Sequence, residues 1–140
     1  MSDSAIEQSA TCVCLRAGVP FVGKQGFTYA AAISAETAGA SALHMQLLTV
    51  PPGARAKAHK HEAHETAIYV LSGEVGMYYG AKLENHMVTR AGDFVYIPAN
   101  MPHLPYNMSQ TEPATAVISR TDPNEQESVV LLPELDAIHP

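Results

Sequence analysis

Four histidines in the middle of the chain, His59, His61, His64 and His103, carry the side chains best suited to bind a metal ion. His59 and His61 are separated by one residue, so on an extended segment both imidazoles point to the same face. Glu65 follows after a short turn and can supply a carboxylate oxygen. Two or three imidazoles with a carboxylate suit Fe(II), Mn(II), Zn(II), Ni(II) or Cu(II), with coordination positions left for water or substrate. These residues predict a site for one divalent transition metal ion.

The histidines lie within two blocks of regular spacing. The first block reads Gly53-ARAKA-His59-Lys-His61-EAH-Glu65-TAIYVLS-Gly73, and the second reads Gly92-DFVYI-Pro98-Ala-Asn100-MP-His103-LPY-Asn107. The two blocks resemble, in this order, the first and second motifs of the cupin superfamily, and in particular those of single-domain bacterial cupins.

The resemblance implies an all-β fold, a double-stranded β-helix or jelly-roll barrel with the metal ligands inside. Carried over residue by residue, it places His59, His61, Glu65 and His103 at the ligand positions. The physics agrees for His103, because two neighbouring prolines stiffen a loop that can return the chain to the first histidine pair. Asn100 stands where the family usually has glycine, and asparagine tolerates the left-handed conformation.

The spacing after Glu65 departs from the family pattern. Seven residues separate Glu65 from Gly73, one more than is usual, so counting back from Gly73 places Thr66 at the carboxylate position. Successive strand residues face opposite sides, so both side chains can point inward only across a bulge. Either a bulge makes Glu65 a ligand, which we favour, or the metal is held by histidines alone, with His64 as a possible contributor. A solvated or supporting role for His64 is the simpler expectation.

Short β-prone runs separated by Gly, Pro, Asn and Asp surround the two blocks and are typical of a β-sandwich or barrel. The expected strands are Cys12–Arg16, Phe27–Ala32, Ala42–Val50, Ala67–Leu71, Val75–Tyr79, Met87–Thr89, Phe94–Ile97, Ala114–Ser119 and Val129–Leu132. A single short helical stretch is expected at Ala35–Ala40. The two cysteines of the first run, Cys12 and Cys14, are interpreted as small buried apolar side chains.

Length and composition place these elements in one domain. The chain has 140 residues, 46% of them hydrophobic and 16% charged, which is typical of a single globular domain. Within it we expect a loose tail over 1–10 and a barrel over 11–121. An extension over 122–140 is expected to pack on the barrel or on a partner subunit. The net charge of −6, with scattered basic residues, argues against nucleic-acid binding. Neither a membrane-spanning run nor a secretory leader is recognisable, so the expected location is the cytoplasm.

Cupins include enzymes of several classes and non-catalytic proteins, so function must be argued from the site. We expect a metal-dependent enzyme acting on a small organic molecule, with a dioxygenase-type oxidoreductase as the leading class. The alternatives are a non-catalytic metal- or metabolite-binding module and an isomerase or decarboxylase using the same metal. Tyr106, near His103, is the candidate substrate contact. Exposed strand edges and the apolar run Val129–Leu132 predict a homodimer, although this run can equally pack on its own barrel.

Overall fold

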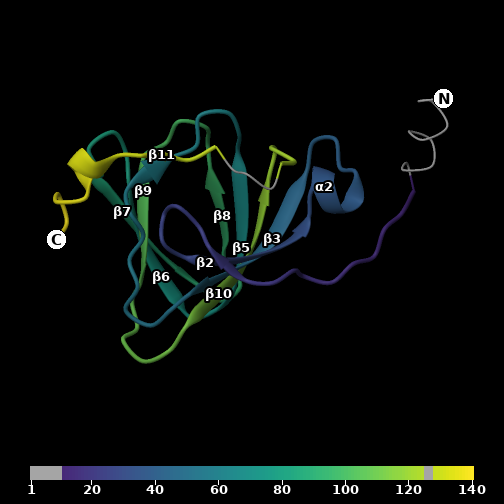
Figure 1. Cartoon of the computed structure of the whole chain (residues 1–140). Helices are drawn as coiled ribbons and strands as arrows, with labels where there is room; N and C mark the ends of the chain where they lie inside the picture. The colour runs from purple at the N-terminus through teal and green to yellow at the C-terminus, as the bar shows by residue number, and fades with distance from the viewer. Residues whose placement is uncertain (1–10, 125–127) are drawn as a thin grey trace.

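Two antiparallel sheets form the body of the molecule, with their inner faces turned toward each other (Figure 1). The computed structural model describes residues 11–124 and 128–140. The first sheet, sheet A, contains in spatial order β1 (Phe21–Val22), β2 (Thr28–Ile33), β3 (His44–Val50), β10 (Ala114–Arg120), β5 (Thr66–Ser72) and β8 (Phe94–Ile97). The second, sheet B, contains β11 (Val130–Leu131), β4 (His59–Lys60), β9 (His103–Asn107), β6 (Glu74–Tyr79) and β7 (Asn85–Arg90).

Alternation of inward and outward side chains explains why these segments form strands. Along β10 the residues Ala114, Ala116 and Ile118 are buried while those between them are half-buried, which is the pattern of a strand with one face in the core. Phe27, Tyr29 and Val50 join Ala114 and Ile118 in the main core cluster. The expected all-β jelly-roll architecture is therefore confirmed.

The only helices of the described chain are short. Helix α2 (Ala35–Ala38) begins at a capping box between Ser34 and Thr37 and ends at Gly39, whose φ of 72° is the left-handed conformation that glycine adopts most easily. The 3-10 turn η1 (Pro133–Leu135) follows β11. No helix among the described residues is long and apolar enough to cross a membrane.

The outer face of sheet B is covered by the end of the chain. Strand β11 pairs with β4, and Leu132 and Leu135 pack against a buried cluster of Ala58, Leu83 and Leu104. Beyond them, the ring of His139 stacks on Tyr78 at 3.7 Å between ring centroids, and its Nε2 lies 2.7 Å from the carbonyl oxygen of Leu83. The Val129–Leu132 run thus contacts its own barrel through Leu132.

Two expectations about secondary structure are wrong. Residues 12–16 form no strand, and Cys12 and Cys14 are exposed free thiols instead of buried side chains. No strand was predicted directly after Pro102, but residues His103–Asn107 form strand β9, which pairs with both β4 and β6. The tail at 1–10 lies outside the described residues.

Candidate metal centre

Two short strands of sheet B bring the histidines together. His59 on β4 pairs directly with His103 on β9, and His61 is the first residue after β4. The ring centroids are 4.2 Å apart for His59 and His103, 5.1 Å for His59 and His61, and 5.3 Å for His61 and His103. All three side chains are buried, and one nitrogen from each lies within 4.8 Å of the others. The structure therefore unites the three histidines that the two motifs predict.

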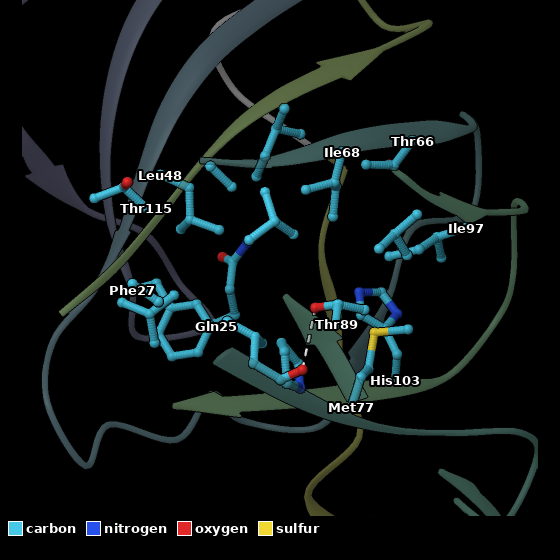
Figure 2. Close-up of a pocket in the computed structure, with 18 of the residues that line it drawn as sticks. Gln25, Phe27, Leu48, Thr66, Ile68, Met77, Thr89, Ile97, His103 and Thr115 are labelled. Carbon is cyan, nitrogen blue, oxygen red and sulfur yellow. Dashed lines mark hydrogen bonds between the residues drawn. The ribbon is translucent and has the colours of Figure 1, made fainter. Parts of the chain in front are cut away.

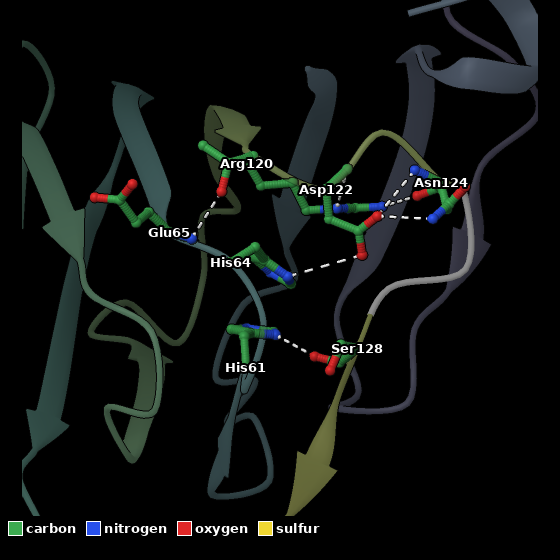
Figure 3. A network of polar contacts seen from close by, with 8 residues as sticks. His61, His64, Glu65, Arg120, Asp122, Asn124 and Ser128 are labelled. Carbon is green, nitrogen blue, oxygen red and sulfur yellow. Dashed lines mark hydrogen bonds and ion pairs between the residues drawn. The ribbon is translucent and has the colours of Figure 1, made fainter. Parts of the chain in front are cut away.

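Backbone carbonyl groups fix the orientation of each imidazole. The Nδ1 atom of His59 lies 2.7 Å from the carbonyl oxygen of Lys57, and that of His103 lies 2.9 Å from the carbonyl oxygen of Met101. The Nδ1 atom of His61 lies 2.9 Å from the carbonyl oxygen of Ser128 (Figure 3). A carbonyl oxygen only accepts, so each Nδ1 must donate its hydrogen. In a neutral ring this leaves the lone pair on Nε2, the tautomer that a metal ligand needs.

The turn between β8 and β9 fastens the second motif to the first. Asn100 adopts a φ of 65°, as its position in the motif predicts, and its N–H donates to the carbonyl oxygen of His61 at 2.7 Å. At the end of β9, the side-chain amide of Asn107 donates to the carbonyl oxygens of Val50, Pro51 and Glu112. These bonds hold β9, and with it His103, in register beside β4.

The three rings border a cavity of about 80 Å³ between the sheets (Figure 2). Its walls are mostly apolar and come from both sheets; they include Phe27, Leu48, Ile68, Met77 and Ile97. The polar side chains of the lining are the three histidines with Gln25, Tyr29, Thr66, Thr89 and Thr115. Among the described residues that line the cavity there is no carboxylate, lysine, arginine or cysteine. One water molecule needs roughly 10–15 Å³ of such a volume. The cavity therefore has room only for a small ligand.

The donor set fits a divalent transition metal ion. Three neutral imidazoles of fixed tautomer suit iron, nickel, copper or zinc, and an ion that prefers more than three ligands keeps positions for water or substrate. Burial of the rings against apolar side chains keeps competing water away. His59, His61 and His103 are the residues that could hold the ion.

The structure corrects the prediction for Glu65. Its side chain is exposed, and its carboxylate accepts a hydrogen bond from the Tyr96 hydroxyl at 2.7 Å, an interaction that raises the pKa of Tyr96. Figure 3 shows the Glu65 side chain directed away from His61. The carboxylate is therefore outside the group of possible ligands in this structure.

Strand pairing explains this outcome. A register irregularity does occur in β5, but at its far end: Val70 pairs with Ala116 and Ser72 pairs with Thr115, so Leu71 is an extra residue. From Thr66 to Val70 the pairing is regular, and Thr66, the first residue of the strand, is buried in the cavity wall. Because Glu65 immediately precedes an inward residue, its side chain faces outward.

His64 lies behind the three-histidine group and is not a member of it. The side chain is buried, its ring centroid is 4.7 Å from that of His61, and its Nδ1 is 3.8 Å from the carboxylate of Asp122 (Figure 3). The supporting role expected from the sequence agrees with this position better than the alternative role of ligand, although the ring is buried and not solvated.

Tyr106 cannot serve as the predicted contact within the cavity. It is the third residue after His103 on β9 and faces the opposite side of the sheet. There its hydroxyl lies 2.7 Å from Nε2 of His86, and its ring lies over Gly76, where an added Cβ would approach the ring within 2.3 Å. Burial raises the pKa of the Tyr106 hydroxyl.

Two participants were not predicted from the sequence, and a third, Thr66, was considered there only as the alternative to Glu65. Gln25 and Thr66 line the cavity, and the carbonyl group of Ser128 orients His61. Counting back from Gly73 was the signal that pointed to Thr66. A single sequence contains no comparable signal for Gln25 or for a main-chain carbonyl sixty-seven residues away from its partner.

The fold and the three-histidine group together define a cupin. A family model described as the cupin domain matches residues 46–119, and the chain belongs to this family. No curated protein matches the chain.

Among solved structures, the chain is similar to oxalate decarboxylase from Bacillus subtilis. The structure of that enzyme at pH 4.6 has 25% sequence identity and a TM-score of 0.68, over 81% of this chain and 29% of that one. The structure from a study of its Mn(II) centres has 25% sequence identity and a TM-score of 0.66, over 79% of this chain and 29% of that one. A structure from a study of the substrate-binding mode of oxalate decarboxylase has 26% sequence identity and a TM-score of 0.67, over 81% of this chain and 30% of that one. The chain thus spans less than a third of the length of these proteins.

Proposed function

We propose that this cupin is a metal-dependent enzyme acting on a small organic molecule, and that its reaction is a dioxygenase-type oxidation. One observation carries the proposal: three buried imidazoles of fixed tautomer open onto a mostly apolar cavity of about 80 Å³ between the sheets. A divalent ion bound there would bind substrate oxygen atoms at its open positions and, if redox-active, would activate dioxygen.

The protein's own contribution is orientation and exclusion of water. The carbonyl groups that accept from the three Nδ1–H groups hold the rings in one geometry, so binding an ion requires little rearrangement. The apolar walls keep bulk water from the reacting atoms, which strengthens electrostatic interactions in the cavity. The size of the cavity also limits the substrate to a small molecule.

The cavity lining favours oxidation over reactions that depend on proton transfer. An isomerase requires a side chain that gives or takes a proton within hydrogen-bonding reach of the substrate. Of the described lining residues, only Tyr29 and the three histidines can be titrated, and the histidines are assigned to the ion. A reaction whose chemistry is carried mainly by the metal is the better fit.

Decarboxylation of a small carboxylic acid is the second candidate, and one observation favours it. The solved structures that resemble the chain are of oxalate decarboxylase, at 25–26% identity. The chain covers about 30% of those proteins, so the similarity alone does not transfer their activity. The two candidates differ in a measurable way, because a dioxygenase consumes dioxygen stoichiometrically with its substrate.

The test begins with metal content after purification and reconstitution under anaerobic conditions with Fe(II) or Mn(II). Each form is then supplied with small keto acids, enols, catechols and oxalate, while dioxygen uptake and carbon dioxide release are recorded together. Uptake of dioxygen with incorporation of both its atoms into product supports the proposal. Carbon dioxide release without net dioxygen uptake supports the second candidate.

Two histidine variants make the test specific. His59→Ala should lower metal affinity at least about tenfold and abolish turnover, because it removes one of three ligands. His86→Ala is the matched control, since His86 is exposed and lies outside the cavity. If every metal-loaded form is inert toward the whole panel, the enzyme proposal fails and a non-catalytic metal-binding module remains.

A further inference from the structure

The hydroxyl group of Thr66 is an unusual feature of the described part of the protein. Thr66 is 6% exposed, and its Oγ1 atom is buried without a hydrogen-bond partner among the described residues. Its strand neighbours on the inner face, Ile68 and Val70, are apolar. A buried hydroxyl that makes no hydrogen bond is destabilising, and valine would fill the same space without this cost.

The position of Thr66 indicates what the hydroxyl could bind. Thr66 lines the same cavity as the three histidines, and Figure 2 shows it at the same side of the pocket as His103, with Phe27 and Thr115 at the other. It also stands one residue after Glu65, whose carboxylate faces outward. A neutral hydroxyl therefore occupies the inner position, where a carboxylate would have added a negative charge.

We propose that Thr66 is a positioning residue that hydrogen-bonds an oxygen atom of the molecule bound at the metal centre. This inference rests on the proposed function for the presence of the ion. Three neutral imidazoles leave the full 2+ charge of the ion uncompensated, and the described cavity lining contains no other charged side chain. The site therefore favours a small ligand that brings its own negative charge on oxygen, a carboxylate or an enolate that chelates through two oxygen atoms.

The test compares Thr66→Val, Thr66→Ser and, as matched control, Thr49→Val, which removes a hydroxyl from β3 outside the cavity lining. Oxalate is the probe, and its binding to the Mn(II)-loaded proteins is followed by the electron paramagnetic resonance of the ion. Thr66→Val should weaken oxalate binding about three- to tenfold, the effect of one hydrogen bond. Thr66→Ser should retain most of the binding, and Thr49→Val all of it.

Two further measurements separate this inference from the proposed function. Thr66→Val should change Mn(II) affinity less than about twofold and leave the melting temperature of the metal-free protein unchanged or higher. A lower melting temperature would show that the hydroxyl serves the fold. Unchanged oxalate affinity in Thr66→Val, or no oxalate binding by the wild type, overturns the inference while the metal site stands. If the wild type binds neither Mn(II) nor Fe(II), both proposals fall.

A separate observation concerns the outer face of sheet A. On this face, residues that pair directly across neighbouring strands form two rows. One row consists of Leu47, Val117, Tyr69 and Phe94, and the other consists of Met45, Ser119, Ala67 and Tyr96. None of these eight side chains is charged. Phe94 is 82% exposed and Tyr96 60% exposed. Charge-free rows with exposed aromatic rings are typical of the centre of a protein interface.

We infer that a second copy of this chain covers this face. Phe94, Tyr96, Tyr69, Leu71, Leu47 and Met45 together expose roughly 600 Å², close to the roughly 800 Å² that each partner contributes to a standard interface. The face also carries a hollow lined by Met45, Tyr69 and Val117 beside the projecting ring of Phe94. A surface with both a projection and a hollow can complement itself across a two-fold axis, with the two sheets packed face to face.

Sedimentation velocity of the full chain tests this surface. The wild type should sediment as a dimer at micromolar concentrations, and Phe94→Glu as a folded monomer, because two-fold symmetry places two charges in one apolar contact. Tyr96→Ser provides a second variant if Phe94→Glu does not fold, and Val19→Asp, on an exposed segment away from the face, is the control. A monomeric wild type, or a folded Phe94→Glu variant that remains dimeric, refutes the inference.

Discussion

The two sheets have similar strands but different surroundings. Sheet B carries the three histidines on or beside β4 and β9, and its outer face is covered by Leu132, η1 and His139 of the same chain. Sheet A supplies much of the cavity wall, and its outer face is left bare with aromatic rings exposed. The comparison teaches that the chain itself covers the outer face of the sheet that carries the three histidines and leaves the outer face of the other sheet exposed.

The largest difference is expected between alanine substitutions on the outer faces of the two sheets, measured as the loss in free energy of unfolding. Leu104 is fully buried beneath the C-terminal segment, so Leu104→Ala should lower the free energy of unfolding by about 3 kcal/mol. Leu47→Ala on sheet A should cost below about 1 kcal/mol in a monomer. Urea denaturation in the Phe94→Glu background measures both without a contribution from self-association. Equal losses would refute the contrast.

Removal of the metal should weaken sheet B more than sheet A. An ion present at a hundred times its dissociation constant stabilises the native state by about 2.7 kcal/mol. Chelation should therefore lower the melting temperature and speed hydrogen exchange at the β4 and β9 amides, with little change in β3. Uniform loss of protection across both sheets would mean that the ion stabilises the protein only globally.

The C-terminal segment that packs on sheet B should also stabilise the fold through a single hydrogen bond. The carboxylate of Asp136 accepts from the backbone N–H of Ala58, immediately before His59, at 2.7 Å. Asp136→Ala should cost about 1–2 kcal/mol, because it leaves that amide without its partner. Thermal denaturation measures this loss, with Glu134→Ala as a control on an exposed neighbouring side chain.

The smallest effect is expected at Glu65. Glu65→Ala should change metal affinity less than about twofold, because the carboxylate faces outward to Tyr96. Competition with a chromophoric chelator measures the affinity, and His103→Ala provides the positive control. A tenfold loss in Glu65→Ala would restore the carboxylate to the ligand set.

The sequence predicted the fold and the histidines well for a physical reason. The spacing within each motif is set by strand length and turn geometry, so His59, His61 and His103 could be placed without knowledge of the distant contacts. Glu65 was placed wrongly because the outcome depended on which residue begins β5. That boundary is decided by pairing of Thr66 with Ile97 and Arg120, partners that a local pattern does not contain.

Tyr106 shows a second limit of local patterns. No strand was predicted for its segment, which contains Pro105, but the neighbouring strand β4 is only two residues long. Pro105 therefore lies beyond the end of β4 and disturbs no pair with it. Cys12–Arg16 shows the reverse case, because its residues favour a strand and yet lie in an exposed, irregular segment.

The hydrogen bonds from the imidazoles to main-chain carbonyl groups affect how the site can change during evolution. Substitutions at Lys57, Met101 or Ser128 alter side chains but leave the carbonyl oxygens that orient the three rings. Side-chain substitutions near the site should therefore leave the orientation of the rings intact, whereas an insertion or deletion that shifts the main chain should disturb it. His61 is the most vulnerable of the three, since its carbonyl partner belongs to the C-terminal segment and would be lost with a premature stop codon.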